Sequence, residues 1–172
     1  MSNEQKKVMA GIVSAIVFCT AFFEVAFRAA SIDLAPPGGI DAAWRLSYAI
    51  RWESISALCL FAGVGLVANR RFVIPEAIAG DAVPAVEIDR RYVQNTLEQL
   101  MLAFVVHLAM ATILPDNELR VIPILVALFV IGRVAFWIGY HIAPTARAFG
   151  FATTFYPTIV AYVYVVSRVL LG

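Results

Sequence analysis

Five long apolar runs constrain this chain more than any other feature of its sequence. The hydrocarbon core of a bilayer is about 30 Å thick, so an α-helix needs roughly 20 apolar residues to cross it. The runs cover residues 8–30, 47–68, 93–114, 121–142 and 149–171. Because 62% of the 172 residues are hydrophobic, the chain has more apolar surface than one soluble core could bury. The sequence therefore predicts an all-α integral membrane protein with five spans.

Helix-breaking residues between the runs support the same division. They are APPGG (35–39), Pro75, Gly80, Pro84, the polar hairpin LPDNELR (114–120) and Pro144. The first run could be mistaken for a signal peptide, but it is longer than the roughly 7–15 apolar residues typical of such segments. Arg28 also interrupts AFRAAS, the stretch that would have to be the cleavage site. We therefore expect this run to be a retained helix.

Lysine and arginine residues near the span ends predict the orientation, since cytoplasmic ends carry an excess of them. An N-terminus in the cytoplasm places seven on that side: Lys6, Lys7, Arg70, Arg71, Arg90, Arg91 and Arg147. The opposite side receives Arg28, Arg45, Arg51, Arg120 and Arg168. Three of these five, Arg28, Arg51 and Arg168, lie within apolar runs rather than in loops. We expect the N-terminus in the cytoplasm and the C-terminus outside, in the inner membrane if the source is bacterial.

Composition also excludes some functions. A net charge of +1 argues against nucleic acid as a partner, because nucleic acid requires a basic patch or stripe. Cys19 and Cys59 each lie inside an apolar run, which favours two reduced thiols over a disulfide. His107 has no second ligand at metal-binding spacing, so we expect no metal site and a hydrogen-bonded histidine inside the bundle.

Three polar residues share one face at the start of the third run. Arg91, Asn95 and Glu98 are spaced i, i+4, i+7, which places them on a single helical stripe. The arginine suits a carboxylate and the glutamate suits an ammonium group, so the stripe could hold a zwitterion. The alternative is a helix start carrying interfacial charges with an internal Arg91–Glu98 contact. Spacing alone does not separate the two.

A second set recurs every seven residues, at Arg133, Tyr140 and Arg147. A continuous helix would nearly align them, but Pro144 interrupts that continuity. An arginine as deep in an apolar run as Arg133 faces the bundle interior and a partner, for which we expect Glu98. The alternative is a purely structural ion pair, with Tyr140 as an interfacial aromatic residue and Arg147 as a cytoplasmic anchor.

Charged residues near the other end of the first two runs predict a structural cluster. Glu24 and Arg28 are spaced i, i+4, and Arg51 and Glu53 lie near the start of the second run. We expect these four residues to form ion pairs in the outer leaflet.

Three sequence motifs resemble the MAPEG family, the membrane-associated proteins of eicosanoid and glutathione metabolism. VANRRF at the end of the second run is similar to the arginine pair that ends the family's first helix. RYVQNTLE supplies the family's R-x-x-x-N-x-x-E pattern, and GRVAFWIGY followed by ARAFGF resembles its G-R…Y helix and downstream arginine. The resemblance covers about residues 47–171.

The resemblance implies a four-helix bundle that assembles as a homotrimer, with sites between neighbouring subunits near the cytoplasmic face. We therefore expect two parts. Residues 1–46 would hold an additional N-terminal transmembrane helix and an outer loop, and residues 47–172 would form the MAPEG-like bundle.

The resemblance also implies a glutathione transferase or peroxidase that uses glutathione as co-substrate against a lipophilic electrophile. Arg147 would activate the sulfur. The implied glutathione-binding residues are Arg70, Arg71, Arg91, Asn95, Glu98, Arg133 and Tyr140. Two positions depart from eicosanoid-synthesising members, because Gln99 and Phe136 stand where those carry tyrosines. This favours a generic or divergent member over a leukotriene-type synthase.

Two other functions are compatible with the same sequence. One is a non-catalytic scaffold or accessory subunit built on the trimeric bundle, with the additional helix docking a partner. The other is a small transporter or channel with Arg133 and Glu98 along its path, although no broken helices or inverted repeat support it.

Overall fold

The computed structural model describes residues 1–30 and 40–171, and all regular structure in these ranges is helical. The APPGG connector expected at 35–39 lies outside the described residues. The elements are α1 (Asn3–Ala29), α2 (Ala42–Val73), α3 (Pro75–Ala79), α4 (Pro84–Ile113), the 3-10 turn η1 (Asp116–Glu118), α5 (Val121–Ile142) and α6 (Arg147–Leu171). The five long helices are each long and apolar enough to cross a membrane, as the sequence predicts.

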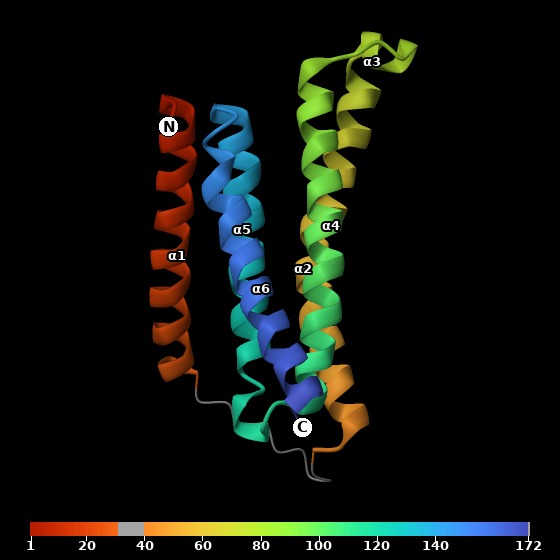
Figure 1. Cartoon of the computed structure of the whole chain (residues 1–172). Helices are drawn as coiled ribbons and strands as arrows, with labels where there is room; N and C mark the ends of the chain where they lie inside the picture. Colours follow the sequence, from red (N-terminus) through yellow and green to blue (C-terminus); the bar gives the residue numbers. More distant parts are fainter. Residues whose placement is uncertain (31–39, 172) are drawn as a thin grey trace.

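The long helices run up and down in one bundle (Figure 1). α2 pairs with α4, α5 pairs with α6, and α1 packs mainly against α6. The N-terminus lies at the same end as α3, and the C-terminus lies at the opposite end. We call these the N-terminal and C-terminal ends of the bundle. An odd number of spans requires this separation, whichever end faces the cytoplasm.

Local sequence explains where the helices begin and end. The Ser2 hydroxyl oxygen accepts a hydrogen bond from the Gln5 amide, and the Gln5 side-chain oxygen accepts one from the Ser2 amide, a capping box that starts α1. The Asp41 carboxylate accepts from the Trp44 amide (2.7 Å) and starts α2 five residues earlier than its apolar run predicts. Pro84 occupies the first turn of α4, where a missing amide proton costs nothing.

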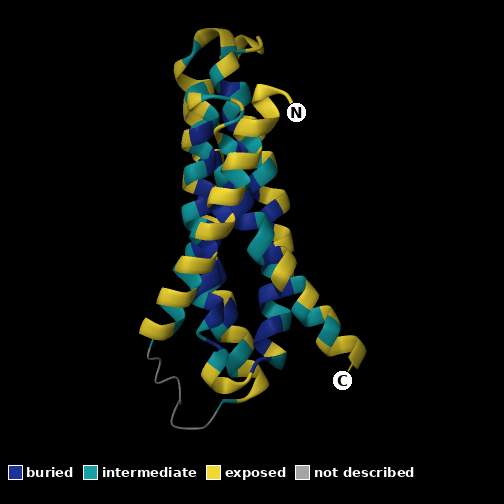
Figure 2. Cartoon of the chain, turned by 60° about the vertical axis from the view of Figure 1, so that its left-hand side comes forward, coloured by how far each residue is buried: buried dark blue, intermediate teal, exposed yellow. Residues whose placement is uncertain are grey.

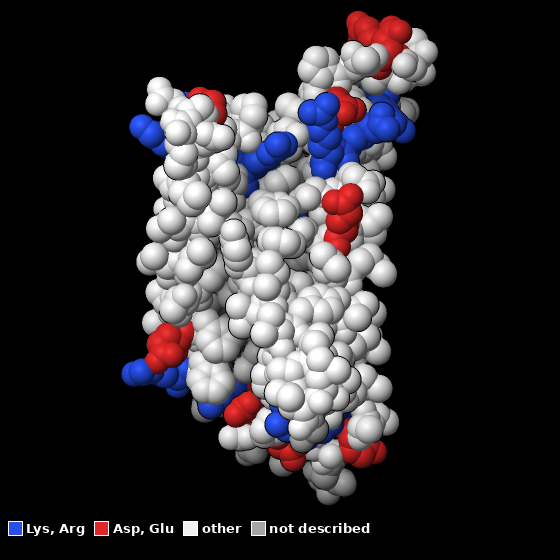
Figure 3. Space-filling view, in the orientation of Figure 1, with Lys and Arg blue, Asp and Glu red and all other residues white. Residues whose placement is uncertain are grey.

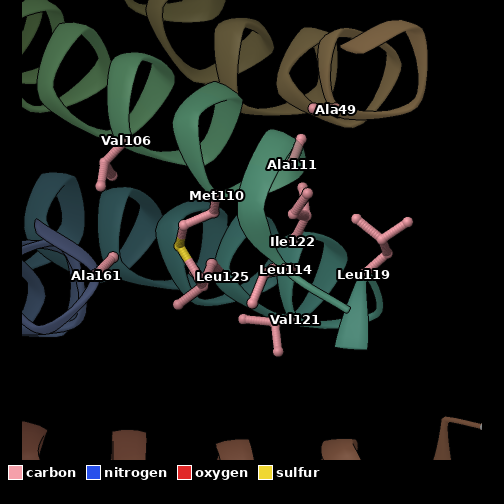
Figure 4. Packing of buried hydrophobic residues seen from close by; sticks show 10 residues of the cluster. All are labelled: Ala49, Val106, Met110, Ala111, Leu114, Leu119, Val121, Ile122, Leu125 and Ala161. Atoms are coloured by element: carbon pink, nitrogen blue, oxygen red, sulfur yellow. The ribbon is translucent and has the colours of Figure 1, made fainter. Parts of the chain in front are cut away.

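The buried core lies around α5. Figure 2 shows buried residues running through the middle of the bundle, whereas α1 and the C-terminal part of α6 are largely exposed. Figure 4 shows one core cluster at the C-terminal end of the bundle, built from α2, α4, α5 and α6. Its residues are Ala49, Val106, Met110, Ala111, Leu114, Leu119, Val121, Ile122, Leu125 and Ala161. The exposed apolar side chains of the other helices form the lipid-facing surface expected of a membrane bundle.

Glycines bring α5 and α6 into close contact. A Cβ atom added at Gly150 would lie 2.5 Å from the Phe136 Cα and 2.6 Å from the Gly132 carbonyl oxygen. Both neighbours belong to the backbone, so neither can rotate away. Small residues at such crossings allow backbones in a membrane to approach, and here they set the spacing of the two helices.

The Gly150→Ala substitution should therefore force α5 and α6 apart and destabilise the bundle by about 1–3 kcal/mol. The matched control is Gly65→Ala in α2, where an added Cβ meets nothing within 4 Å. That change should be neutral or stabilise the helix by up to about 1 kcal/mol. Thermal unfolding in detergent measures both, and equal midpoints for the two variants would contradict the packing argument.

Candidate functional site

Basic residues gather at the N-terminal end of the bundle. The starts of α1, α4 and α6 and the end of α2 bring together Lys6, Lys7, Arg70, Arg71, Arg90, Arg91 and Arg147. Figure 3 shows this end rich in lysine and arginine, above a middle band that is largely uncharged. The seven basic residues expected on one side therefore lie at one end. That this end faces the cytoplasm stays a prediction.

Arg133 is fully buried and joins three helices. From α5, its Nη1 donates to Asn95 Oδ1 on α4 (2.8 Å). Its Nη2 donates to Thr154 Oγ1 (2.5 Å) and the Gly150 carbonyl (3.4 Å) on α6. The guanidinium also lies 4.8 Å from the centre of the Phe136 ring. These contacts stabilise a positive charge that would otherwise be costly inside a membrane.

The prediction that Arg133 pairs with Glu98 is wrong. Glu98 is exposed and accepts a hydrogen bond from Gln94 (2.8 Å), while Asn95 takes the place beside Arg133. At 100° per residue, Asn95 is rotated about 60° from Glu98 toward the buried face of α4. The stripe is thus split, with Asn95 directed inward and Glu98 outward. Because Arg133 has no exposed surface, a ligand could touch it only if its neighbours moved.

Tyr140 and Arg147 meet across the turn between α5 and α6. The helix is not continuous through Pro144, since α5 ends at Ile142 and α6 begins at Arg147. The chain folds back tightly enough that a Cβ on Gly139 would lie 2.7 Å from the Ala146 carbonyl oxygen. This turn places the Arg147 guanidinium 4.5 Å from the centre of the Tyr140 ring.

Arg91 completes a group of three at this end. Its side chain lies near Tyr140 and forms an ion pair with Glu87, whose Oε1 lies 2.8 Å from its Nε. Arg91, Tyr140 and Arg147 therefore come together from α4, α5 and α6, although the chain separates the first and last by 56 positions. We call these three residues the cationic triad.

A cleft of about 560 Å³ lies next to the triad, between α2 and α4. Val64, Val67, Ala68 and Val93 form its apolar wall, and Arg71, Glu87, Arg90, Arg91 and Gln94 form its polar wall. Such a mixed surface can take a charged group at one side and an apolar group at the other. Arg91 belongs to both the cleft and the triad.

The two neighbouring arginines of α2 have different surroundings. Arg71 lines the cleft, whereas Arg70 forms an ion pair with Asp89, a fully buried carboxylate of α4. Asp89 also accepts a hydrogen bond from Trp137 Nε1 (3.2 Å) and lies 3.2 Å from His141 Nε2. Sequence reasoning missed Asp89 as well as Glu87. The acids within VEIDRR, next to an arginine pair, were the available signal.

A second buried polar pair lies deeper in the bundle. His107 on α4 contacts Glu53 on α2 through Nδ1 and Oε1, and each side chain is at most 2% exposed. This confirms His107 as a hydrogen-bonded bundle histidine. It corrects the expected outer-leaflet cluster, because Glu53 points inward while Arg51 is exposed. The Glu24–Arg28 pair of that cluster does form (2.6 Å), on the surface of α1. Within residues 1–30 and 40–171, no group of three or more His, Cys, Asp or Glu residues is placed to hold a metal ion.

A double-mutant cycle should reveal how strongly the Glu53–His107 pair is coupled. His107→Leu leaves a buried carboxylate without its partner and should cost about 3–5 kcal/mol of stability. In the double variant Glu53→Leu/His107→Leu, most of that loss should be recovered, because neither polar group is then stranded. Thermal unfolding of the four proteins in one detergent provides the measurement. Strictly additive effects would show that the pair is not coupled.

Comparisons with known proteins agree with this architecture. The sequence model of the MAPEG family matches residues 52–167, a segment that runs from α2 into α6. Transmembrane protein 79 of Mus musculus is 27% identical over 164 residues, which cover 94% of this chain and 41% of that protein. Transmembrane protein 79 of Bos taurus is 32% identical over 80 residues, covering 46% of this chain and 20% of that protein. No solved structure matches the chain.

Two features of these matches concern the length of the chain and the position of α1. The chain spans about two fifths of the length of the mouse protein, so that relative has a large part without a counterpart here. The alignment with the mouse protein covers 94% of this chain. The residues outside it are too few to include the whole 27-residue helix α1. The family match, in contrast, begins only at residue 52. The helix α1 therefore lies outside the family segment, and most of it falls within the region shared with this relative.

Proposed function

The chain belongs to the MAPEG family, and on that basis we propose that it is a membrane-bound, glutathione-dependent transferase or peroxidase. Its substrates would be lipophilic electrophiles dissolved in the bilayer. The observation that carries the proposal is the cationic triad, in which Arg147 stacks on Tyr140 beside Arg91 at the edge of a cleft.

Arg147 would activate the sulfur by stabilising its anionic form. A free thiol has a pKa near 8.5, so only a few per cent is thiolate at neutral pH, and the thiolate is the nucleophile. A guanidinium in a partly desolvated pocket favours S⁻ and lowers that pKa by about one to three units. An arginine cannot accept the proton, which passes to water instead. Stacking on Tyr140 limits the directions that the Arg147 side chain can take.

The chemical step then needs little from the protein beyond positioning. In the transferase reaction the thiolate sulfur attacks an electrophilic carbon and forms a C–S bond. The displaced electron pair moves to the leaving group or to an epoxide oxygen, which takes a proton from water. Because the triad lies at the end of the apolar helices, a lipophilic electrophile could reach it from the membrane while glutathione enters from water.

The remaining residues would bind the tripeptide. Arg71 and Arg91 present guanidinium groups to its carboxylates, and the exposed Glu98 suits its ammonium group. Asn95 is partly exposed, so the Nδ2 of the amide whose Oδ1 binds Arg133 would contact the peptide groups of the tripeptide. Two further arginines act indirectly, since Arg133 holds Asn95 in place and Arg70 is engaged by Asp89. Tyr140 would lie along the tripeptide.

We also propose that the site is completed by a neighbouring subunit of a homotrimer. Glu98, Arg91 and the cleft all face outward from the single chain, and a second wall is needed to exclude water. The N-terminal end would face the cytoplasm, where the basic residues gather.

Purified protein mixed with glutathione should develop the ultraviolet absorbance of a thiolate. Arg147→Ala should abolish that signal, because it removes the positive charge nearest the sulfur, and should leave the oligomer intact. The matched control is Arg168→Ala, an exposed arginine in the last turn of α6 at the opposite end. An unchanged signal in Arg147→Ala would assign activation to another residue. Absence of binding at millimolar glutathione would favour the scaffold function.

Arg91→Ala and Glu98→Ala should each weaken glutathione binding by about tenfold or more, because each removes a charge-assisted contact. Calorimetric titration measures the affinity, and size-exclusion chromatography with light scattering measures the assembly. If either variant dissolves the oligomer with no loss of affinity per folded site, the stripe is structural.

A further inference from the structure

A second hollow lies far from the cationic triad, where α1 and α6 separate. Its volume is about 490 Å³. α1 and α6 form its sides, and α5 contributes to its floor. The apolar side chains lining it include Ile16, Phe23, Leu125, Leu128, Tyr156 and Val160. Because α1 lies outside the family match, this groove forms only where the additional helix packs against the family core. We call it the α1–α6 groove.

The groove exists because α1 and α6 pack tightly over only half their length. Toward the N-terminal end, a Cβ on Gly11 would lie 3.2 Å from both the Ala148 Cβ and the Phe149 amide nitrogen. The Phe18 and Phe149 rings follow, with 5.7 Å between their centres. Beyond Cys19 the two helices diverge, as Figure 2 shows at the lower end of the bundle.

Pro157 marks the point of divergence. A proline inside a helix has no amide proton for the carbonyl four residues earlier, and its ring bends the helix. That carbonyl belongs to Thr153, and here it accepts a hydrogen bond from the Cys19 thiol at 3.7 Å. α1 thus satisfies the group that Pro157 leaves free. Beyond this contact, the C-terminal half of α6 turns away from α1 and opens the groove.

Two carboxylates, Glu24 near the end of α1 and Glu118 in η1, lie at the mouth of the groove. From Glu24 to Ile16 the groove extends along α1 for eight residues, or about 12 Å at 1.5 Å per residue. It therefore runs from the edge of the bundle toward the middle of the membrane, within one leaflet.

The charges at the mouth include a carboxylate that is available to a headgroup amine. Of the nearby guanidinium groups, Arg28 is paired with Glu24, and Arg120 donates to the Ala30 carbonyl (2.9 Å) and stacks on Phe27. Glu118 forms no ion pair with any residue that the structure describes. Arg120 likewise forms no ion pair with a described residue, so the mouth presents one carboxylate and one guanidinium without ionic partners, next to a groove that is almost wholly apolar. A zwitterionic headgroup, which carries an ammonium group beside its phosphate, matches this pair.

We propose that the α1–α6 groove binds one acyl chain of a phospholipid whose headgroup carries an amine. The chain lies along the apolar wall, and the ammonium group lies between Glu24 and Glu118. The lipid belongs to the leaflet at the C-terminal end of the bundle. This site is independent of glutathione, so its failure would leave the proposed function untouched.

The test compares two tryptophan substitutions on α6. Val160→Trp fills the groove, whereas Val163→Trp places the same side chain at a position of similar exposure (64% against 68%) outside the groove lining. Each protein is delipidated, reconstituted with phosphatidylethanolamine or phosphatidylglycerol, and examined by native mass spectrometry. The original chain and Val163→Trp should retain phosphatidylethanolamine. Val160→Trp should retain at least about tenfold less, because the indole ring displaces several CH₂ groups of the acyl chain from the groove.

The acidic mouth is tested separately with Glu24→Gln/Glu118→Gln, and the matched control is Glu76→Gln in α3 at the opposite end. The double variant should lose the preference for phosphatidylethanolamine over phosphatidylglycerol, and the control should keep it. Equal retention in both tryptophan variants would overturn the acyl-chain site. An unchanged lipid preference in the double variant would overturn the amine assignment. A changed oligomeric mass in Val160→Trp alone would identify the groove as a contact between copies of the chain.

Discussion

A guanidinium group inside a membrane has no water to bond with, so the protein itself must supply its hydrogen-bond partners. The packing of the bundle around Arg133 meets this requirement. Three helices meet there because α4 supplies Asn95 and α6 supplies Thr154 and the Gly150 carbonyl. The glycine that offers its carbonyl is also the residue that lets α5 and α6 approach. The same glycine therefore allows the close packing of α5 and α6 and accepts a hydrogen bond from the buried charge. Moving any of the three helices would strand a charge in a medium without water.

The same arrangement fixes the position of the cationic triad. Arg133 sets how α4, α5 and α6 are rotated relative to one another, and the next turns toward the N-terminal end carry Arg91, Tyr140 and Arg147. Asp89 has a comparable role nearby, since it joins Arg70 of α2 to Trp137 and His141 of α5. The proposed chemistry needs one positive group held beside one sulfur. The buried polar contacts of Arg133 and Asp89 hold that group rigidly in place. They do not occupy the surface where a ligand would bind.

The additional helix α1 is held in the bundle by a different kind of contact. It joins the bundle through a glycine, an aromatic pair and one thiol contact, and its surface between the charged residues at its two ends is largely apolar. A helix held in this way gives little to the triad, which lies on the other helices. Its consequence is the groove that opens beyond Pro157, at the end of the bundle opposite the triad. The protein thus offers one polar site near water and one apolar site within the bilayer.

The sequence by itself determined the five helices, the gathering of basic residues at one end and the three motifs that resemble the MAPEG family. These follow from apolar length, helical spacing and charge near span ends, which are all local properties of the chain. Only the tertiary structure decided that Arg133 bonds Asn95 instead of Glu98, that Glu53 pairs with His107, and that Arg147 reaches Tyr140 across the interrupted helix. Each of these outcomes depends on how one helix is rotated against another. A difference of about 60° around α4 exchanges an inward residue for an outward one, and no local pattern fixes that angle.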